Sequence, residues 1–267
     1  MCLLGSPGLQ FAHKNSTMEN KIPSTNSAIS TLLQADFRTQ WRNRRAVIMI
    51  IIVPVFILIS WKGLVEKYGG AFALSNAITI GLTAIGLMGY SNAIARDRDK
   101  GVFQRLRVAP VPAWTIMMSR LAVQLTLIMI TTTAVFVAGF YYDKISLDMS
   151  GYILGLLAAF AGGAMYLGLG QAIAGMINNA ETVNSTTRLV YFFFIMIGMF
   201  GGLGVLGKEI GELVKWSPYG TVAHILASSM KPSTWDMEST MSLLLTAGYA
   251  TIFSSMGIKW FKWSSAR

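Results

Sequence analysis

The sequence predicts an all-α membrane protein that contains six transmembrane helices. Only 13% of its 267 residues are charged and 53% are hydrophobic, and several long apolar stretches contain no charge. A soluble domain carries roughly 25% charged residues. A helix of about 20 apolar residues is long enough to cross roughly 30 Å of hydrocarbon. The chain is therefore expected to bury much of its apolar surface in lipid.

The amino-terminal part of the chain is polar. Residues 1–30 are rich in Ser, Thr and Asn and lack the apolar core of a signal peptide, which predicts a flexible cytoplasmic tail. In residues 31–45, apolar positions recur at helical spacing and arginines cluster beyond them. This pattern predicts an amphipathic helix in the membrane interface, and the alternative is a polar start to the first transmembrane helix. The positions are Leu32, Leu33, Phe37 and Trp41, with Arg38, Arg42, Arg44 and Arg45.

Six apolar segments follow, and each is long enough for a transmembrane helix. Pro54 lies inside the first segment and predicts a kink, since proline removes a backbone hydrogen bond that neighbouring groups must replace. Arg120, in the third segment, is expected to snorkel to the interface. The segments are 46–64, 71–95, 114–142, 152–177, 189–206 and 240–259.

Residues 207–238, between the last two segments, are too apolar for an exposed loop and too broken to cross the membrane. Two short helices that are interrupted at Ser217 and Pro218 fit this stretch. Backbone breaks at membrane depth require protein or water around them. We therefore predict a broken helix pair that re-enters the outer leaflet and packs against the transmembrane helices.

Six crossings place both termini on one side, and the distribution of Lys and Arg identifies that side. The termini and the loops after the second and fourth segments hold 16 of the 22 cationic residues. These parts are therefore predicted to be cytoplasmic. This asymmetry explains the net charge of +10, so no nucleic-acid partner is expected.

The sequence shows no recognisable catalytic or metal-binding constellation. Gly202, Gly204 and Gly207 match the spacing of a dinucleotide-binding motif, but that motif needs a preceding strand. Glu209 stands where a phosphate-binding loop needs Ser or Thr. We therefore predict no enzyme activity, no metal site and no cofactor in this chain. The lack of acidic residues within the apolar segments favours an external energy source.

The loop at residues 96–112 is predicted to dock a protein partner. Five alternating charges precede a glycine and a short helix-forming stretch with an apolar ridge, and a proline ends the element. The simpler alternative is an ordinary cytoplasmic loop that is basic because of its location. The residues assigned to docking are Asp97, Arg98, Asp99, Gly101, Phe103, Leu106 and Pro110.

This loop resembles the signature of ABC-type-2 exporter permeases, in which an acidic–Arg–acidic–x–Gly run precedes a leucine and a proline. Two features differ from that pattern, because Val102 replaces the usual threonine and both acids are Asp where Glu is commoner. The resemblance covers residues 46–263 as a six-span permease domain and includes the helix before it. The matching residues are Asp97, Arg98, Asp99, Gly101, Leu106 and Pro110.

The resemblance implies a half-transporter in a bacterial inner (plasma) membrane. Two permease chains pair, as a homodimer or a heterodimer, and each binds a separate ABC ATPase subunit that holds ATP and Mg²⁺. The ATPase contacts the loop and the interfacial helix, where Arg38 and Arg42 are the candidate contacts. The alternatives are a permease that exports a lipid-linked glycan or polysaccharide, and a non-transport membrane assembly protein.

The fifth segment favours a lipophilic substrate. Its aromatic and methionine side chains are candidates for lining the path, because methionine-rich surfaces adapt to varied apolar ligands. The simpler alternative is a helix that faces lipid or packs against its neighbours. The resemblance is closest to the antibiotic and multidrug-resistance branch, so a drug, an antibiotic or a lipid-like molecule is expected. The candidates are Tyr191, Phe194, Met196, Met199 and Phe200.

Overall fold

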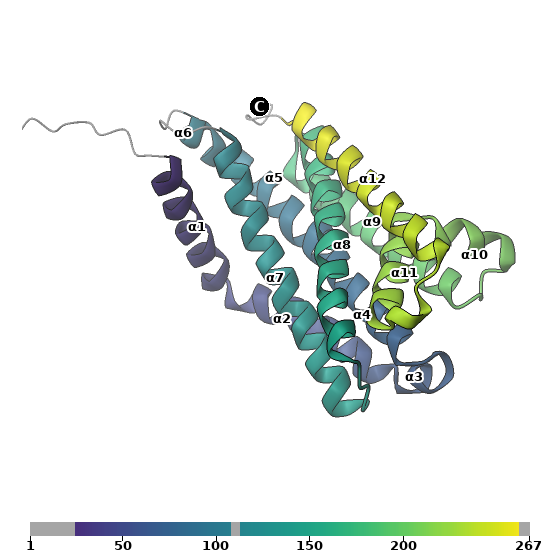
Figure 1. Cartoon of the computed structure of the whole chain (residues 1–267). Helices are drawn as coiled ribbons and strands as arrows, with labels where there is room; N and C mark the ends of the chain where they lie inside the picture. Colours follow the sequence, from purple (N-terminus) through teal and green to yellow (C-terminus); the bar gives the residue numbers. More distant parts are fainter. Residues whose placement is uncertain (1–24, 108–112, 262–267) are drawn as a thin grey trace, which may run out of the picture.

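The computed structural model describes residues 25–107 and 113–261, and these ranges form a bundle of helices without a strand (Figure 1). The helices are α1 (Thr25–Arg42), α2 (Arg44–Ser60), α3 (Lys62–Tyr68), α4 (Gly70–Thr83), α5 (Ser91–Asp99), α6 (Val102–Arg107), α7 (Ala113–Tyr142), α8 (Met149–Met176), α9 (Ala180–Gly202), α10 (Lys208–Lys215), α11 (Pro218–Met230) and α12 (Met237–Lys259). A π-helical segment (Ala84–Tyr90) joins α4 to α5, and a 3₁₀ turn (Pro232–Thr234) precedes α12.

Within these ranges, five helical segments are long and apolar enough to cross a membrane alone. They are the continuous α4–α5 helix, α7, α8, α9 and α12. A sixth crossing requires α1 and α2 together. The predicted all-α membrane fold is therefore confirmed, with five or six crossings.

α1 and α2 meet at a sharp bend of 74° at Asn43. Pro54, where the sequence predicts a kink, lies inside α2, and the helix continues through it. α1 is attached to α7, because Ser119 donates a hydrogen bond of 2.6 Å to the carboxylate of Asp36 and Leu32 packs against the core. The amphipathic stretch therefore rests on the bundle along α7.

The α4–α5 helix is the centre of the bundle. In its most apolar stretch of 18 residues, 78% is buried inside the protein. α7, α8, α9 and α11 all contact it. Its π-helical segment packs tightly on α8, because a Cβ at Gly86 would meet the backbone of Tyr166 and a Cβ at Gly170 would meet the carbonyl oxygen of Gly86. Small residues permit this approach, which maximises packing between membrane helices.

α8 and α12 contact each other along much of their lengths, again through small residues such as Gly168, Gly175 and Gly257. α9 begins earlier than the predicted residue 189, because the side chain of Asn179 caps it by accepting hydrogen bonds from two backbone N–H groups.

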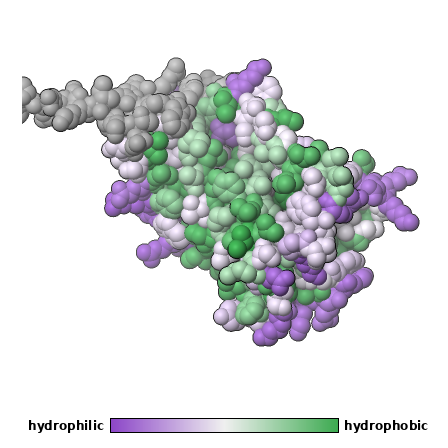
Figure 2. Space-filling model, viewed as in Figure 1, coloured by the Kyte–Doolittle hydropathy of each residue, from purple (hydrophilic) through white to green (hydrophobic). Residues whose placement is uncertain are grey.

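α9 and α12 are the least covered of the five helical segments. In each of them, only 17% of the most apolar stretch of 18 residues is buried inside the protein. Both helices therefore leave a broad apolar face uncovered. Figure 2 shows hydrophobic side chains over the middle of the face that Figure 1 presents.

The predicted pair of short helices between the last two crossings is present as α10 and α11. The chain breaks at Ser217, whose hydroxyl accepts a hydrogen bond from the N–H of Gly220, and Pro218 opens α11. The hydroxyl of Tyr249 donates a hydrogen bond of 2.9 Å to the carbonyl of Trp216. The freed backbone groups at the break therefore find partners inside the protein, as a low-dielectric environment requires.

Replacement of Gly170 by Ala should destabilise the protein. The new methyl group would meet the carbonyl oxygen of Gly86 closer than real Cβ atoms approach backbone. We expect a loss of about 1–3 kcal/mol, which is typical of overpacking, and a lower melting temperature of the detergent-solubilised chain. Gly248→Ala is the matched control, because nothing lies within 4 Å of its Cβ position. An equal melting temperature for the two variants would contradict the close packing of α8 on the π-helical segment.

Candidate functional site

One end of the bundle carries α6, the start of α1 and the end of α12, and we call it the loop end (Figure 1). The predicted docking residues of α5 and α6 lie here, whereas Arg38 and Arg42 lie toward the far end of α1, beside the middle of α7. The opposite end carries a pocket among α4, α9, α10 and α11. The two ends are the candidate sites for a protein partner and for a transported molecule.

Arg98 is fully buried at the loop end, although the sequence predicted that it contacts a partner. Its guanidinium donates hydrogen bonds to the backbone carbonyls of Ala174 (2.7 Å), Ile177 (2.6 Å) and Asn178 (3.0 Å). These carbonyls lie at the end of α8, where a helix leaves unpaired acceptors and the negative end of its dipole. The structure therefore gives Arg98 a different role from docking, which is to join α5 to α8 and the start of α9.

Asp97 and Phe103 also make contacts inside the chain. The carboxylate of Asp97 pairs with Arg120 of α7 at 2.5 Å, so Arg120 is held by an ion pair rather than snorkelling freely. The guanidinium of Arg120 lies 4.8 Å from the ring centre of Phe103, a cation–π contact. Phe103 is fully buried and packs edge to face on Phe261, with ring centres 5.3 Å apart. Phe103 therefore anchors α6 and offers no surface to a partner.

The residues that remain exposed at the loop end are mostly charged. Gly101 has a positive φ of 68°, which glycine adopts without strain, and it forms the turn between α5 and α6. Leu106 belongs to α6, and Pro110 lies outside the described residues. The side chains that stay accessible around this turn and on α1 are Arg96, Asp99, Lys100, Gln104 and Arg105, with Arg38 and Arg42.

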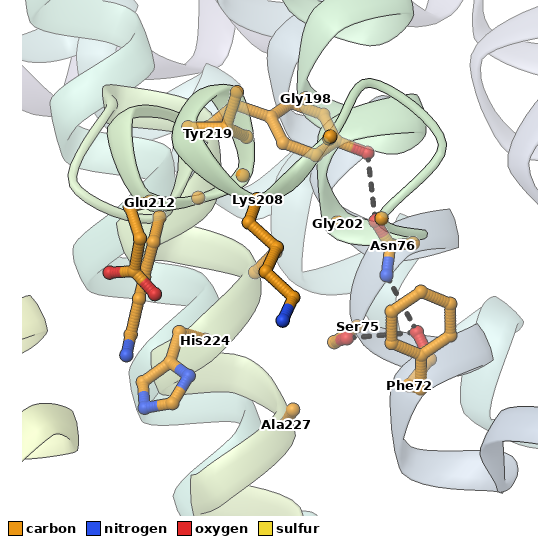
Figure 3. Close-up of a pocket in the computed structure, with 18 residues that line it drawn as sticks. Phe72, Ser75, Asn76, Gly198, Gly202, Lys208, Glu212, Tyr219, His224 and Ala227 are labelled. Carbon is orange, nitrogen blue, oxygen red and sulfur yellow. Dashed lines mark hydrogen bonds between the residues drawn. The ribbon is translucent and has the colours of Figure 1, made fainter.

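The pocket at the other end has a volume of about 470 Å³, and we call it the outer pocket. Figure 3 shows Lys208 extending into it between His224 and the α4 residues. The phenol of Tyr219 donates a hydrogen bond of 3.1 Å to Asn76, which ties α11 to α4 at the pocket wall. The lining is therefore an apolar wall with a few polar groups, a combination typical of small-molecule sites.

α9 contributes glycines to the outer pocket rather than its aromatic and methionine side chains. Gly198, Gly201 and Gly202 line the pocket. Phe194 instead packs near Tyr166, with ring centres 6.5 Å apart. The five predicted path residues are all half-buried on α9, and none of them lines the outer pocket: Tyr191, Phe194, Met196, Met199 and Phe200. The sequence analysis considered the spacing of Gly202, Gly204 and Gly207 only as a nucleotide-binding motif, and these three glycines line the pocket.

His224, Asp236 and Glu238 form a group beside the pocket in which one ligand atom from each lies within 4.8 Å of the others. Asp236 caps α12 by accepting hydrogen bonds from the backbone N–H and the hydroxyl of Ser239, and these bonds hold the pKa of its carboxyl below the ordinary value. Glu238 pairs with Lys215 at 2.5 Å. Glu238 therefore joins α12 to α10, and the carboxylate of Asp236 also lies 3.9 Å from the His224 ring of α11.

Comparison with known proteins adds one finding. The family model described as ABC-2 type transporter matches residues 27–220. This range includes α1, the α5–α6 turn, α9 and the break before α11. No curated protein matches the sequence.

Arg98→Ala should destabilise the loop end selectively. It would leave three carbonyls at the end of α8 without their donors, and loss of hydrogen bonds to a buried charged group costs about 3 kcal/mol. We expect a lower melting temperature and faster hydrogen exchange at residues 174–178. Arg96→Ala, which removes an exposed arginine two positions away, is the control and should change neither quantity. Unchanged exchange at the end of α8 in Arg98→Ala would show that the buried arginine does not hold this junction.

Proposed function

The chain belongs to the ABC-2 type transporter family, and from that premise we propose that this permease subunit exports a lipophilic molecule. Membership makes it the membrane-spanning component of an ABC transporter, a family that generally works with an ABC ATPase partner. The proposal adds the direction of transport, the docking surface, the pairing of two permease chains and the class of substrate.

The observation that carries the proposal is the rigid attachment of the α5–α6 turn. Arg98 joins the turn to α8, Asp97 joins it to α7, and Phe103 joins it to the end of α12. Exposed charges lie on the outer side of the same turn. A force that an ATPase applies to these charges would therefore move several crossings as a rigid body.

We assign ATPase docking to the exposed charges of the turn and to Arg38 and Arg42 of α1. The charges of the turn lie at the loop end, and Arg38 and Arg42 lie farther along α1, which begins at the loop end and runs toward α2 (Figure 1). ATP and Mg²⁺ bind in the ATPase subunit. The excess of Lys and Arg in the segments at this end supports a cytoplasmic location for it, in a bacterial inner membrane.

The proposed substrate class rests on α9 and the outer pocket. The uncovered face of α9 is apolar, with Leu189, Phe192 and Phe193 exposed, and α9 also forms the glycine wall of the pocket. A second copy of the chain that packs near α9 would enclose a path between the loop end and the outer pocket. A drug, an antibiotic or a lipid-like molecule fits such a path better than a strongly polar one.

Charge reversal on the turn should release the ATPase. In the double variant Asp99→Lys with Arg105→Glu, the net charge stays constant while the pattern of exposed charges is inverted. We expect at least about tenfold weaker binding of the ATPase subunit, measured by co-purification and by its dissociation constant, because misplaced like charges oppose association.

Asp148→Lys with Lys231→Glu is the matched control, since both residues are exposed outside the loop end. It should bind the ATPase as the unmodified chain does. Equal binding by both double variants would refute docking at the α5–α6 turn.

Filling the outer pocket should slow export. Gly202 lines the pocket and has no heavy atom within 4 Å of its Cβ position, so the first carbon of the side chain in Gly202→Leu meets no neighbour. We expect efflux of the lipophilic dye Nile red to fall roughly tenfold, which corresponds to about 1.4 kcal/mol. ATPase co-purification should not change.

Gly248→Leu adds the same side chain to an open site on α12, outside the pocket, and should export normally. If cells that lack the chain and cells that contain it lose the dye equally fast, the lipophilic substrate class is wrong. Export of a lipid-linked glycan would then be the alternative to test.

A further inference from the structure

A second cavity lies at the loop end, between α7, α8 and α12, and we call it the loop-end groove. Its volume is about 500 Å³. Apolar side chains dominate its walls, and two of them, Met118 and Ile258, are also exposed on the surface that faces lipid. The lining includes Met117, Leu121, Leu125, Ala164, Leu167 and Phe261.

A buried polar pair also lines the groove. The hydroxyl of Tyr90 donates a hydrogen bond of 2.7 Å to Oε1 of Gln171, and the two residues are only 2% and 8% exposed. Among the described residues, no hydrogen bond from the Nε2 amide of Gln171 is found, and Gln171 lines the groove. An amide N–H at the wall of an apolar groove favours a ligand that supplies an acceptor, because unpaired polar groups are costly in an apolar environment. The groove therefore presents a hydrogen-bond donor that a ligand with an acceptor oxygen would satisfy.

The depth of Gln171 indicates which ligand brings that oxygen. The 28 residues of α8 extend over about 42 Å at 1.5 Å per residue, which exceeds the roughly 30 Å of hydrocarbon. When α8 is centred, about four residues at each end lie in the headgroup region. Gln171, five residues before the end at Met176, then lies at the hydrocarbon boundary, where the ester carbonyls of phospholipids are found. Ala164 lies about two turns deeper, among the acyl chains.

We propose that the loop-end groove binds one acyl chain of a membrane phospholipid, whose ester carbonyl accepts a hydrogen bond from Gln171. The chain would run from Gln171 toward Ala164, along apolar walls that open to the bilayer. This is a resident lipid, separate from the proposed transport path along α9 and the outer pocket.

A bound lipid at this place would act on the docking element. Phe261 lines the groove and also packs edge to face on Phe103 of α6. An acyl chain against Phe261 therefore braces the contact that holds α6. Occupancy of the groove is expected to stabilise the α5–α6 turn, to which we assign ATPase docking.

The test uses the complete permease–ATPase complex in nanodiscs that contain a phosphatidylethanolamine with a photoreactive diazirine in one acyl chain. Crosslinked peptides are mapped by mass spectrometry. We expect crosslinks in residues 117–125, 164–171 and 254–261. Gln171→Leu should reduce their yield roughly fivefold, as expected for the loss of one hydrogen bond. Ala164→Phe should reduce it more, because it fills the groove.

Ala247→Phe is the matched control, since Ala247 is exposed on α12 outside the groove. Its crosslinking should equal that of the unmodified complex. If Gln171→Leu does not fold, the crosslink map of the unmodified complex and the pair of phenylalanine variants still decide the question. Crosslinks that are spread evenly over lipid-facing helices would overturn the proposal. Displacement of the probe by excess Nile red would also overturn it, because the groove would then hold transported molecules.

Discussion

The attachment of Arg98 to the end of α8 is the constraint on which the loop end depends. A helix that ends inside protein leaves carbonyls without donors, and few side chains can satisfy three of them at once. The planar guanidinium does so, with donor–acceptor distances of 2.6–3.0 Å. The end of α5, the end of α8 and the start of α9 are consequently one unit, so the turn that follows α5 cannot move without them.

Much of the fold was predictable because membrane helices follow length and charge. Uninterrupted apolar segments identified the crossings, and Ser217–Pro218 identified the break before α11. The bend at Asn43 was not predictable in this way, because neither proline nor glycine marks it in the sequence; in the structure α1 is attached to α7 through Asp36 and Ser119. The early start of α9 was visible in principle, since Asn179 is a favourable helix cap.

The candidate sites were harder to predict for a physical reason. A sequence shows that Arg98 and Phe103 are a charge and an aromatic ring, but not which way they point. In this fold both point inward, where α8 and α12 supply their partners. On α9, we predicted the site from the large side chains. The wall of the pocket instead consists of residues without side chains, such as Gly198 and Gly201. Cavities are made by missing volume, so glycine spacing predicts them better than aromatic content does.

The continuous α4–α5 helix gives the proposed transport mechanism its geometry. Asn76 of this helix lies at the wall of the outer pocket, and Asp99 lies at the exposed turn at the loop end. Between them, the π-helical segment packs against α8 where Gly86 meets Gly170. A π-helical segment has looser backbone hydrogen bonding than an α-helix and is often found at functional sites. A tilt imposed at the docking turn would therefore reach the outer pocket through one helix, with the segment around Gly86 as the place where its direction adjusts.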